Sequence, residues 1–336
     1  MADLTTTWLG LKLKSPLVVA ASPLSNDVEA IVTAVSAGAG AVVMHSLFEE
    51  QLIEEQMAAH RFLDARTDMD AEARTFLPDV DVFSLGAEPY LVQMERLRQR
   101  VDVPVIASLN GTTPGGWIDY ARQMEAHGAS AIELNLYEIA TSADLSGVAI
   151  EDMQLKVVES IASLVKLPVT VKLSPFYASL PAFVRRLESA GAKGVSVFNR
   201  FYQPDIDLDN LDVDRHLVFS NPSELPLRLH ALAILSTTTE ISLGCSGGVH
   251  SGRDAAKAIL SGGHVVQLAS VLLEHGPSYI EVISRELNQW LDEKGYTTCA
   301  EARGVLALNS APNPHAWERL NYVRMLDGWK PRNSLR

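Results

Sequence analysis

The feature that most constrains this chain is a strand-then-helix unit that recurs along most of its length. Short, largely apolar runs typical of buried strands begin at Pro16, Ala41, Val103, Ala131, Pro168, Gly194, Ile241 and His264. Segments with the helical spacing of apolar residues, such as Glu88–Arg100, follow many of these runs. Repetition of this unit around eight strands predicts the α/β class and a closed (β/α)8 TIM barrel with right-handed crossovers.

Two polar segments interrupt this rhythm. Residues 49–78 are rich in charge, and they are interpreted either as an excursion over the barrel mouth or as a solvated charged helix. Residues 200–224 contain the alternating run DIDLDNLDVD, which favours a half-exposed hairpin over a calcium loop because the glycine and terminal glutamate positions are not met. We expect no metal site, one barrel domain over residues 1–297, and a helical extension over 298–336 that packs on the barrel or on another subunit.

Charge and cysteine content exclude several classes of protein. The net charge of −13 disfavours nucleic-acid binding, which needs a basic face. Cys245 and Cys299 have no CxxC partner, so neither a disulfide framework nor a cysteine metal site is expected. The first residues do not resemble a signal peptide, and no apolar run reaches the length of about 18 residues that suggests a membrane span. These features predict a cytoplasmic protein without membrane contact.

The stretch Ile241–Ser270 contains two strand-to-loop junctions close together. Gly247 and Gly248 follow the first strand, and Ala269 and Ser270 follow the second. Small residues leave backbone N–H groups uncovered, and clustered amide donors favour an anion. Barrels often bind phosphate after their last two strands. We therefore predict a phosphate site here, with a simple tight turn as the alternative.

Polar residues gather at the carboxyl ends of the predicted strands, where barrel enzymes place their active sites. They are Ser22, His45, Ser46, Ser108, Asn110, Asn135, Tyr137, Glu138, Lys172, Ser174, Asn199 and Arg200. Lys172 lies within the apolar run VTVKL, so it is interpreted as a Schiff-base nucleophile or as a cation that faces an anionic cofactor. The alternative is an internal salt bridge with Glu133.

Taken together, several motifs resemble those of the dihydroorotate dehydrogenases, which are FMN-bound (β/α)8 barrels. The resemblance covers most of residues 5–297 and rests on LGLKLKSPLVVAAS, ELNL at Glu133–Leu136, VKLSP at Val171–Pro175, VFN at Val197–Asn199 and SGGVHSGRDAAKAILSGGHVVQLAS. It implies an FMN-dependent dehydrogenase that acts on a CH–CH donor and transfers hydride from a dihydropyrimidine-like substrate to flavin N5. Oxidation of dihydroorotate to orotate, in pyrimidine biosynthesis, is the default reaction.

The resemblance also implies which residues bind the flavin. The matching positions are Ala21, Ser22, Ser46, Ser108, Asn135, Lys172, Gly247, Gly248, Ala269 and Ser270. Among these, Lys172 would stabilise the anionic reduced flavin by charge pairing in a poorly solvated pocket. Asn135 would contact both flavin and substrate, and the last four positions would hold the phosphate.

The substrate positions depart from the family pattern. The loop after ELNL reads YEIATSAD, so the position of the family's Cys or Ser base falls on Glu138, with Tyr137 beside it. Arg200 replaces a small residue, and it is interpreted as a clamp for a substrate carboxylate or as a solvated loop arginine. The sequence predicts a retained flavin site and a remodelled substrate site made of Asn135, Asn199, Arg200 and His45.

Three functions therefore remain open: dihydroorotate dehydrogenation, flavin-dependent oxidation or reduction of another substrate, and binding by a catalytically degenerate FMN barrel. Since the chain lacks cysteine clusters, electrons are expected to leave to a soluble acceptor or to a separate electron-transfer protein. The resemblance further implies a homodimer, to which the acidic hairpin and the aromatic C-terminal tail would contribute.

Overall fold

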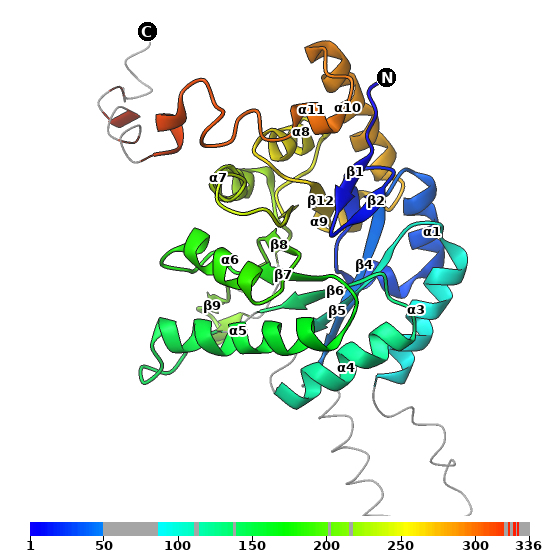
Figure 1. Ribbon diagram of the computed structural model, residues 1–336, viewed down its shortest axis with the longest axis vertical. Helices are drawn as coiled ribbons and strands as arrows, with labels where there is room; N and C mark the ends of the chain where they lie inside the picture. The colour runs from blue at the N-terminus through cyan, green and yellow to red at the C-terminus, as the bar shows by residue number, and fades with distance from the viewer. Residues whose placement is uncertain are drawn as a thin grey trace, which may run out of the picture.

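The strands lie at the centre of the molecule and the helices surround them (Figure 1). The computed structural model describes residues 1–49, 87–110, 114–136, 139–200, 203–214 and 218–318, together with residues 322, 325, 326 and 328. The predicted excursion over residues 49–78 therefore lies almost entirely outside the described residues.

Eight parallel strands form a closed barrel. In spatial order they are β11 (Ser242–Ser246), β12 (Val265–Leu268), β3 (Leu17–Val19), β4 (Ala41–Phe48), β5 (Val105–Asn110), β6 (Ala131–Asn135), β7 (Val169–Leu173) and β8 (Gly194–Val197). Pairing of β8 with β11 closes the ring. The predicted (β/α)8 barrel is confirmed, and the described strands of the barrel follow the order of the chain.

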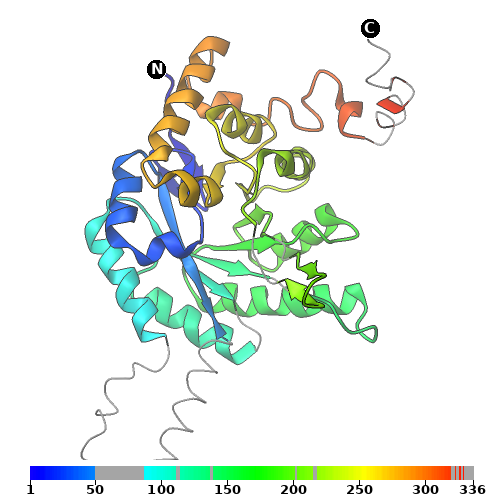
Figure 2. The ribbon, with the colours of Figure 1, turned by 180° about the vertical axis from the view of Figure 1, so that it is seen from behind.

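The helices cover the outside of the barrel (Figure 2). They are α1 (Val28–Ser36), α3 (Glu88–Arg100), α4 (Pro114–Ala126), α5 (Gly147–Leu164), α6 (Leu180–Ser189), α7 (Leu225–Leu235), α8 (Gly252–Leu260), α9 (Ser270–His275) and α10 (Tyr279–Lys294). Each amphipathic helix turns an apolar stripe inward, as α6 does with Phe183, Val184 and Leu187. No helix within the described ranges is long and apolar enough to cross a membrane.

A short hairpin covers the amino-terminal end of the barrel, where the barrel strands begin. Its strands are β1 (Thr6–Trp8) and β2 (Leu11–Leu13), joined by a tight turn at Leu9 and Gly10 with positive φ angles. Trp8, Leu9 and Leu13 are buried together with apolar residues of the barrel interior. The Leu9 N–H also donates to Ser242 Oγ at 3.0 Å, which ties the turn to β11. The sequence analysis did not identify this hairpin.

Two 3-10 helices, η1 (Pro23–Asn26) and η4 (Pro222–Glu224), lead into α1 and α7. The acidic run forms an antiparallel pair, β9 (Asp205–Asp207) and β10 (Asp212–Asp214), as predicted.

The C-terminal extension packs across α8 and α7. It contains α11 (Cys299–Ala302) and the 3-10 helix η5 (Pro314–Trp317), with turns between them. The Gly304 N–H donates to the carbonyl of Ile259 in α8, and the Leu308 N–H donates to that of Ala233 in α7. These bonds hold the described part of the extension against the barrel.

Candidate functional site

Four of the predicted polar residues form one hydrogen-bonded chain at the upper end of the barrel. Asn135 Nδ2 donates to Ser46 Oγ at 2.5 Å and lies 3.3 Å from Ser108 Oγ. The two serine hydroxyls are 2.8 Å apart, and Asn199 Nδ2 donates to Asn135 Oδ1 at 3.4 Å. Strand register explains the grouping, because Ser46 pairs with Ser108 across β4 and β5. The structure thus unites residues from three strands and the end of a fourth.

Tyr90 of α3 supports this chain from outside the barrel. The Ser108 N–H donates to the Tyr90 hydroxyl oxygen at 2.8 Å. The Tyr90 hydroxyl in turn donates to the Ser108 carbonyl at 3.3 Å. Burial raises the pKa of Tyr90, so the hydroxyl stays protonated. The sequence analysis missed Tyr90 because it falls on the apolar face of its helix, where it is indistinguishable from a core residue.

His45 lies beside this group of hydrogen-bonded side chains, but it contacts Ser25 and Tyr90 instead. Its Nδ1 is 3.1 Å from Ser25 Oγ, its backbone N–H donates to the same oxygen at 2.7 Å, and its ring packs edge-on against Tyr90. Burial lowers the pKa of His45, which favours the neutral ring. The structure therefore offers a neutral imidazole at the position where the sequence predicted a substrate contact.

Lys172 lies inside the barrel, next to Asn135 in the register of β6 and β7. Its side chain is 6% exposed, and its Nζ is 3.7 Å from Glu133 Oε1. Glu133 is fully buried, and its Oε2 accepts a hydrogen bond from Gln267 Nε2 at 2.8 Å. The internal ion pair considered for Lys172 is present, but it is long. An ammonium has three donors, and Lys172 has no other polar partner within the described part of the chain, so it can still serve an anionic ligand.

The two glycines after β11 adopt conformations that other residues rarely reach. Gly247 has φ +91° and Gly248 has φ +79°. A Cβ on Gly247 would lie 2.9 Å from the Arg228 guanidinium, and one on Gly248 would lie 2.7 Å from the backbone nitrogen of Leu225. Glycine is therefore required at both positions, by φ and by space.

Ser220 links the two junctions of the predicted phosphate site. The Gly248 N–H donates to Ser220 Oγ at 3.2 Å, and that oxygen is 3.0 Å from Ser270 Oγ. The Ser220 N–H also donates to Ser270 Oγ at 3.0 Å. The structure thus brings Gly248 and Ser270 together, with Ala269 as the residue before α9. Ser220 lies in a loop without a motif, so no sequence signal pointed to it.

Arg228 places a buried positive charge behind Gly247. Its Nε donates to the Ser246 carbonyl at 2.8 Å, and its Nη1 donates to the Glu224 carbonyl at 2.9 Å. Burial lowers the pKa of the guanidinium, although it remains charged at neutral pH. Sequence reasoning missed this residue too. An arginine within the apolar helix LPLRLHALAIL is the signal that could have revealed it.

The other residues predicted to contact flavin or substrate, or to act as the base, differ in their surroundings. Ser22 Oγ is buried and has no hydrogen-bond partner among the described residues, and its neighbour Ala21 is half-buried against the interior of the barrel. Arg200 donates from Nη1 to Glu224 Oε2 at 2.6 Å and from Nε to the Val218 carbonyl, and its side chain is 28% exposed. Tyr137 and Glu138 lie outside the described residues.

Comparisons with known proteins match most of this chain to one family. A family model described as dihydroorotate dehydrogenase matches residues 3–291. The catalytic subunit of dihydroorotate dehydrogenase B (NAD(+)) from Methanosarcina mazei is 28% identical over 306 residues, which cover 89% of this chain and 94% of the relative. The corresponding subunit from Pyrococcus abyssi is 25% identical over 309 residues, 88% of this chain and 96% of the relative.

A further relative carries a different name. The PreA subunit of NAD-dependent dihydropyrimidine dehydrogenase from Escherichia coli strain K12 is 24% identical over 327 residues. The matched region covers 92% of this chain and 78% of that protein. Relatives with two substrate names therefore align along most of this chain.

Proposed function

The chain belongs to the dihydroorotate dehydrogenase family, and from this premise we propose that it is an FMN-dependent oxidoreductase that oxidises a dihydropyrimidine-type ring. The observation that carries the proposal is the hydrogen-bonded chain of Ser46, Ser108, Asn135 and Asn199 beside the buried cation Lys172. Dihydroorotate is the default substrate, because the family and the relatives from Methanosarcina and Pyrococcus are named for it.

The residues present fit a flavin phosphate and an electron-rich ring edge. Gly248, Ser220 and Ser270 form a small polar cradle in which a Cβ at Gly248 would collide with the backbone. Ser22 Oγ offers a buried hydroxyl that lacks a partner within the described ranges. Lys172 would bind the anionic edge of the ring. When bound, FMN supplies the hydride acceptor at N5, which is chemistry that side chains do not provide.

The amide side chains suit a ring that carries alternating carbonyl and N–H groups. Each asparagine presents an acceptor and two donors on one planar group, which matches the edge of a cyclic imide. The side-chain N–H groups of Asn135 donate to Ser46 and Ser108, so the orientation of this amide is fixed before substrate binds. Glu138 is the proposed base and Tyr137 its alternative, by their place after β6.

A neutral dihydropyrimidine is the second candidate substrate. Dihydroorotate carries a carboxylate, and Arg200 is the proposed clamp for it, but this guanidinium is already paired with Glu224 at 2.6 Å. A substrate carboxylate would have to compete with that pair, whereas a dihydropyrimidine without a carboxylate leaves it intact. The Escherichia coli relative, named as a dihydropyrimidine dehydrogenase subunit, supports the same alternative.

Anaerobic mixing of the purified flavoprotein with each candidate tests the proposal. Bleaching of the flavin by dihydroorotate supports the default substrate, and bleaching by dihydrouracil alone supports the neutral ring. If neither compound bleaches a fully loaded protein, while dithionite does, the proposed substrate class is wrong.

Electrons are proposed to leave through a separate protein. The relatives from Methanosarcina and Pyrococcus are named catalytic subunits of NAD(+) enzymes, and the Escherichia coli relative is likewise named a subunit. The cytoplasmic location expected from the sequence is compatible with a soluble electron acceptor or a separate electron-transfer protein.

Replacing Lys172 with alanine is expected to lower the flavin reduction potential, because a cation near the ring is lost while Glu133 stays. Removing one member of a buried pair also leaves an unpaired charge, which costs about 3–5 kcal/mol of stability. We therefore pair Lys172→Ala with the double variant Lys172→Ala/Glu133→Gln. The double variant is expected to recover stability and to show a smaller drop in potential. Unchanged potential in both proteins would make Lys172 purely structural.

The hairpin β9–β10 is proposed to form part of a homodimer interface. Ile206, Leu208, Leu211 and Val213 are between 51% and 86% exposed on it, and contiguous exposed apolar surface marks interaction sites. Sedimentation velocity at micromolar concentration is expected to show a dimer that Leu208→Asp dissociates. Leu227→Asp, a change of the same kind on α7, serves as the control. A monomeric wild-type protein would contradict this assembly. In the aromatic tail, the other predicted contributor, Trp317 Nε1 donates to the Leu306 carbonyl and Tyr322 is 61% exposed, whereas Trp329 lies outside the described residues.

A further inference from the structure

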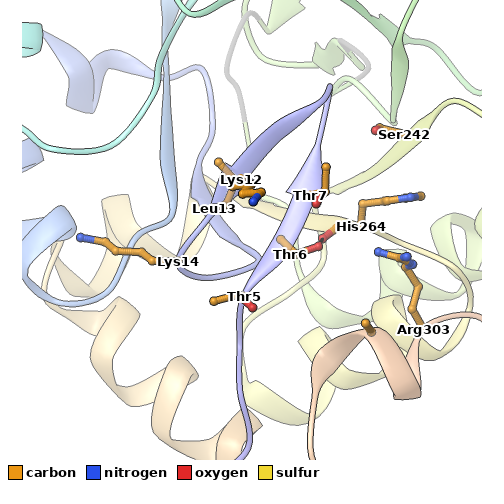
Figure 3. Close-up of a pocket in the computed structure, with 10 residues that line it drawn as sticks. Thr5, Thr6, Thr7, Lys12, Leu13, Lys14, Ser242, His264 and Arg303 are labelled. Carbon is orange, nitrogen blue, oxygen red and sulfur yellow. Dashed lines mark hydrogen bonds between the residues drawn. The ribbon is translucent and has the colours of Figure 1, made fainter.

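A polar cavity lies at the opposite end of the barrel from the hydrogen-bonded serines and asparagines. It has a volume of about 650 Å³ and is bordered by the hairpin strand β1, by the start of β12 and by the end of α11. Figure 3 shows Arg303 and His264 projecting into the space beside Thr6 and Thr7. Since Ser242 and His264 stand at the beginnings of their strands, this cavity opens at the amino-terminal face of the barrel.

Arg303 provides an uncompensated positive charge in this cavity. Its side chain is half-buried, and its guanidinium makes no hydrogen bond or ion pair with any described residue. No aspartate or glutamate is among the residues that line the cavity, although the protein as a whole carries a net charge of −13. Burial lowers the pKa of the guanidinium, which still remains charged. A desolvated cation without a partner is costly, so an anion at this point would be stabilising.

His264 provides a neutral donor next to that charge. The Leu243 N–H donates to His264 Nδ1 at 3.1 Å, so Nδ1 is the unprotonated nitrogen and Nε2 carries the hydrogen. Burial, together with the charge of Arg303, lowers the pKa of His264 to about 4. The ring is therefore neutral at physiological pH. Its Nε2–H has no acceptor within the described ranges.

The hairpin adds two further donors. Thr7 of β1 lies directly opposite Lys12 of β2 in the strand register, so the hydroxyl and the ammonium share one face. Lys14 also borders the cavity, but its side chain points away from Arg303 in Figure 3 and its Nζ is 3.3 Å from Asp102 Oδ1. The cavity thus combines a guanidinium fork, an imidazole N–H, a hydroxyl and one lysine, and this set is dominated by donors.

We propose that this cavity is a binding site for the phosphate group of a small metabolite, with Arg303 as the principal cation and His264 as the neutral donor. A guanidinium presents two parallel N–H groups that match two phosphate oxygens. The proposal concerns the face of the barrel opposite to the proposed flavin site and does not depend on it.

Occupation of the site would link the amino-terminal hairpin to the start of the C-terminal extension. The Asp3 N–H donates to the Thr297 carbonyl and the Cys299 N–H donates to the Asp3 carbonyl, so the segment that leads into β1 already contacts the start of α11. An anion held between Thr7 and Arg303 adds a further contact between these segments. Hydrogen exchange of the amides in residues 299–303 is therefore expected to slow when phosphate is added.

The test is a calorimetric titration with inorganic phosphate at constant ionic strength, on protein that has been loaded with FMN and then freed of unbound flavin by gel filtration. Saturable binding is expected, and Arg303→Gln is expected to weaken it about tenfold or more, since a charge-assisted pair is lost. Lys14→Gln also removes one positive charge nearby, but from a side chain that points away from Arg303. The affinity of this variant for phosphate is therefore expected to stay within about twofold of that of the wild type.

Arg303→Lys controls for a folding defect, because it keeps the positive charge and loses only the paired N–H groups of the guanidinium. This variant is expected to bind phosphate with intermediate affinity. Equal weakening in Arg303→Gln and Lys14→Gln would show a diffuse basic field and overturn the proposal. Absence of saturable binding in wild-type protein, or unchanged affinity in Arg303→Gln, would overturn it as well. Flavin content is expected to be the same in all four proteins, which separates this site from the proposed function.

Discussion

Protein carrying Gly248→Asp is expected to purify without flavin. The new carboxylate would stand where Gly248 meets Ser220 and Ser270, and it would repel the phosphate that we place there. The substitution also forces a side chain onto a residue with φ +79° whose Cβ would lie 2.7 Å from the Leu225 nitrogen. The ratio of released flavin to protein, measured by absorbance after denaturation, gives the result directly.

Because Gly248→Asp combines a clash with a charge, a second pair of variants separates the two effects. Ser270→Asp and Ser270→Asn have nearly the same shape and differ in charge, and Ser270 has an ordinary helical backbone at the start of α9. We expect the aspartate variant to lose much more flavin than the asparagine variant. Circular dichroism checks that each protein is folded. Full flavin content in Gly248→Asp would refute the phosphate placement.

Glu138→Gln is expected to slow flavin reduction by substrate about 10²–10⁴-fold, which is the usual contribution of a positioned general base. The proton next to the ring carbonyl must leave as hydride departs, and glutamine keeps the shape of glutamate without its basicity. Glu138 directly follows Tyr137 after β6, whose last residue, Asn135, belongs to the polar chain at the barrel mouth. Anaerobic stopped-flow reduction, followed by flavin absorbance, measures the rate.

Tyr137→Phe is the matched comparison for the base. If Glu138 acts, the phenylalanine variant is expected to reduce at close to the wild-type rate, and both variants should retain FMN. A wild-type rate in Glu138→Gln together with a slow Tyr137→Phe would transfer the role to the phenol. Loss of flavin in either variant would instead indicate a contribution to cofactor binding.

The sequence identified the polar residues of the candidate site, but it did not identify the residues that hold them in place. Ser46, Ser108, Asn135 and Asn199 were identified because strand ends in a parallel barrel meet at one face. Their supports were not identified. Tyr90, Ser220 and Arg228 come from helices and loops, where no periodicity shows whether a residue turns toward the site or toward the core.

The sequence by itself determined the barrel and the face that carries the site. Short apolar strands alternating with amphipathic helices leave few arrangements that bury both, and the closed parallel barrel is the one observed. Side-chain alternation along β6 and β7 then turns Glu133 and Lys172 to the same interior, so their possible pairing could be anticipated.

Only the tertiary structure decided which distant groups became partners. Arg200 pairs with Glu224, and His45 bonds to Ser25, through turns whose paths depend on long-range packing. The cavity around Arg303 and His264 arises in the same way, because the amino-terminal hairpin and the start of the C-terminal extension meet there at the amino-terminal face of the barrel. Local patterns set the direction of a side chain relative to its own strand or helix, whereas partners far apart in sequence are chosen by how the finished elements pack.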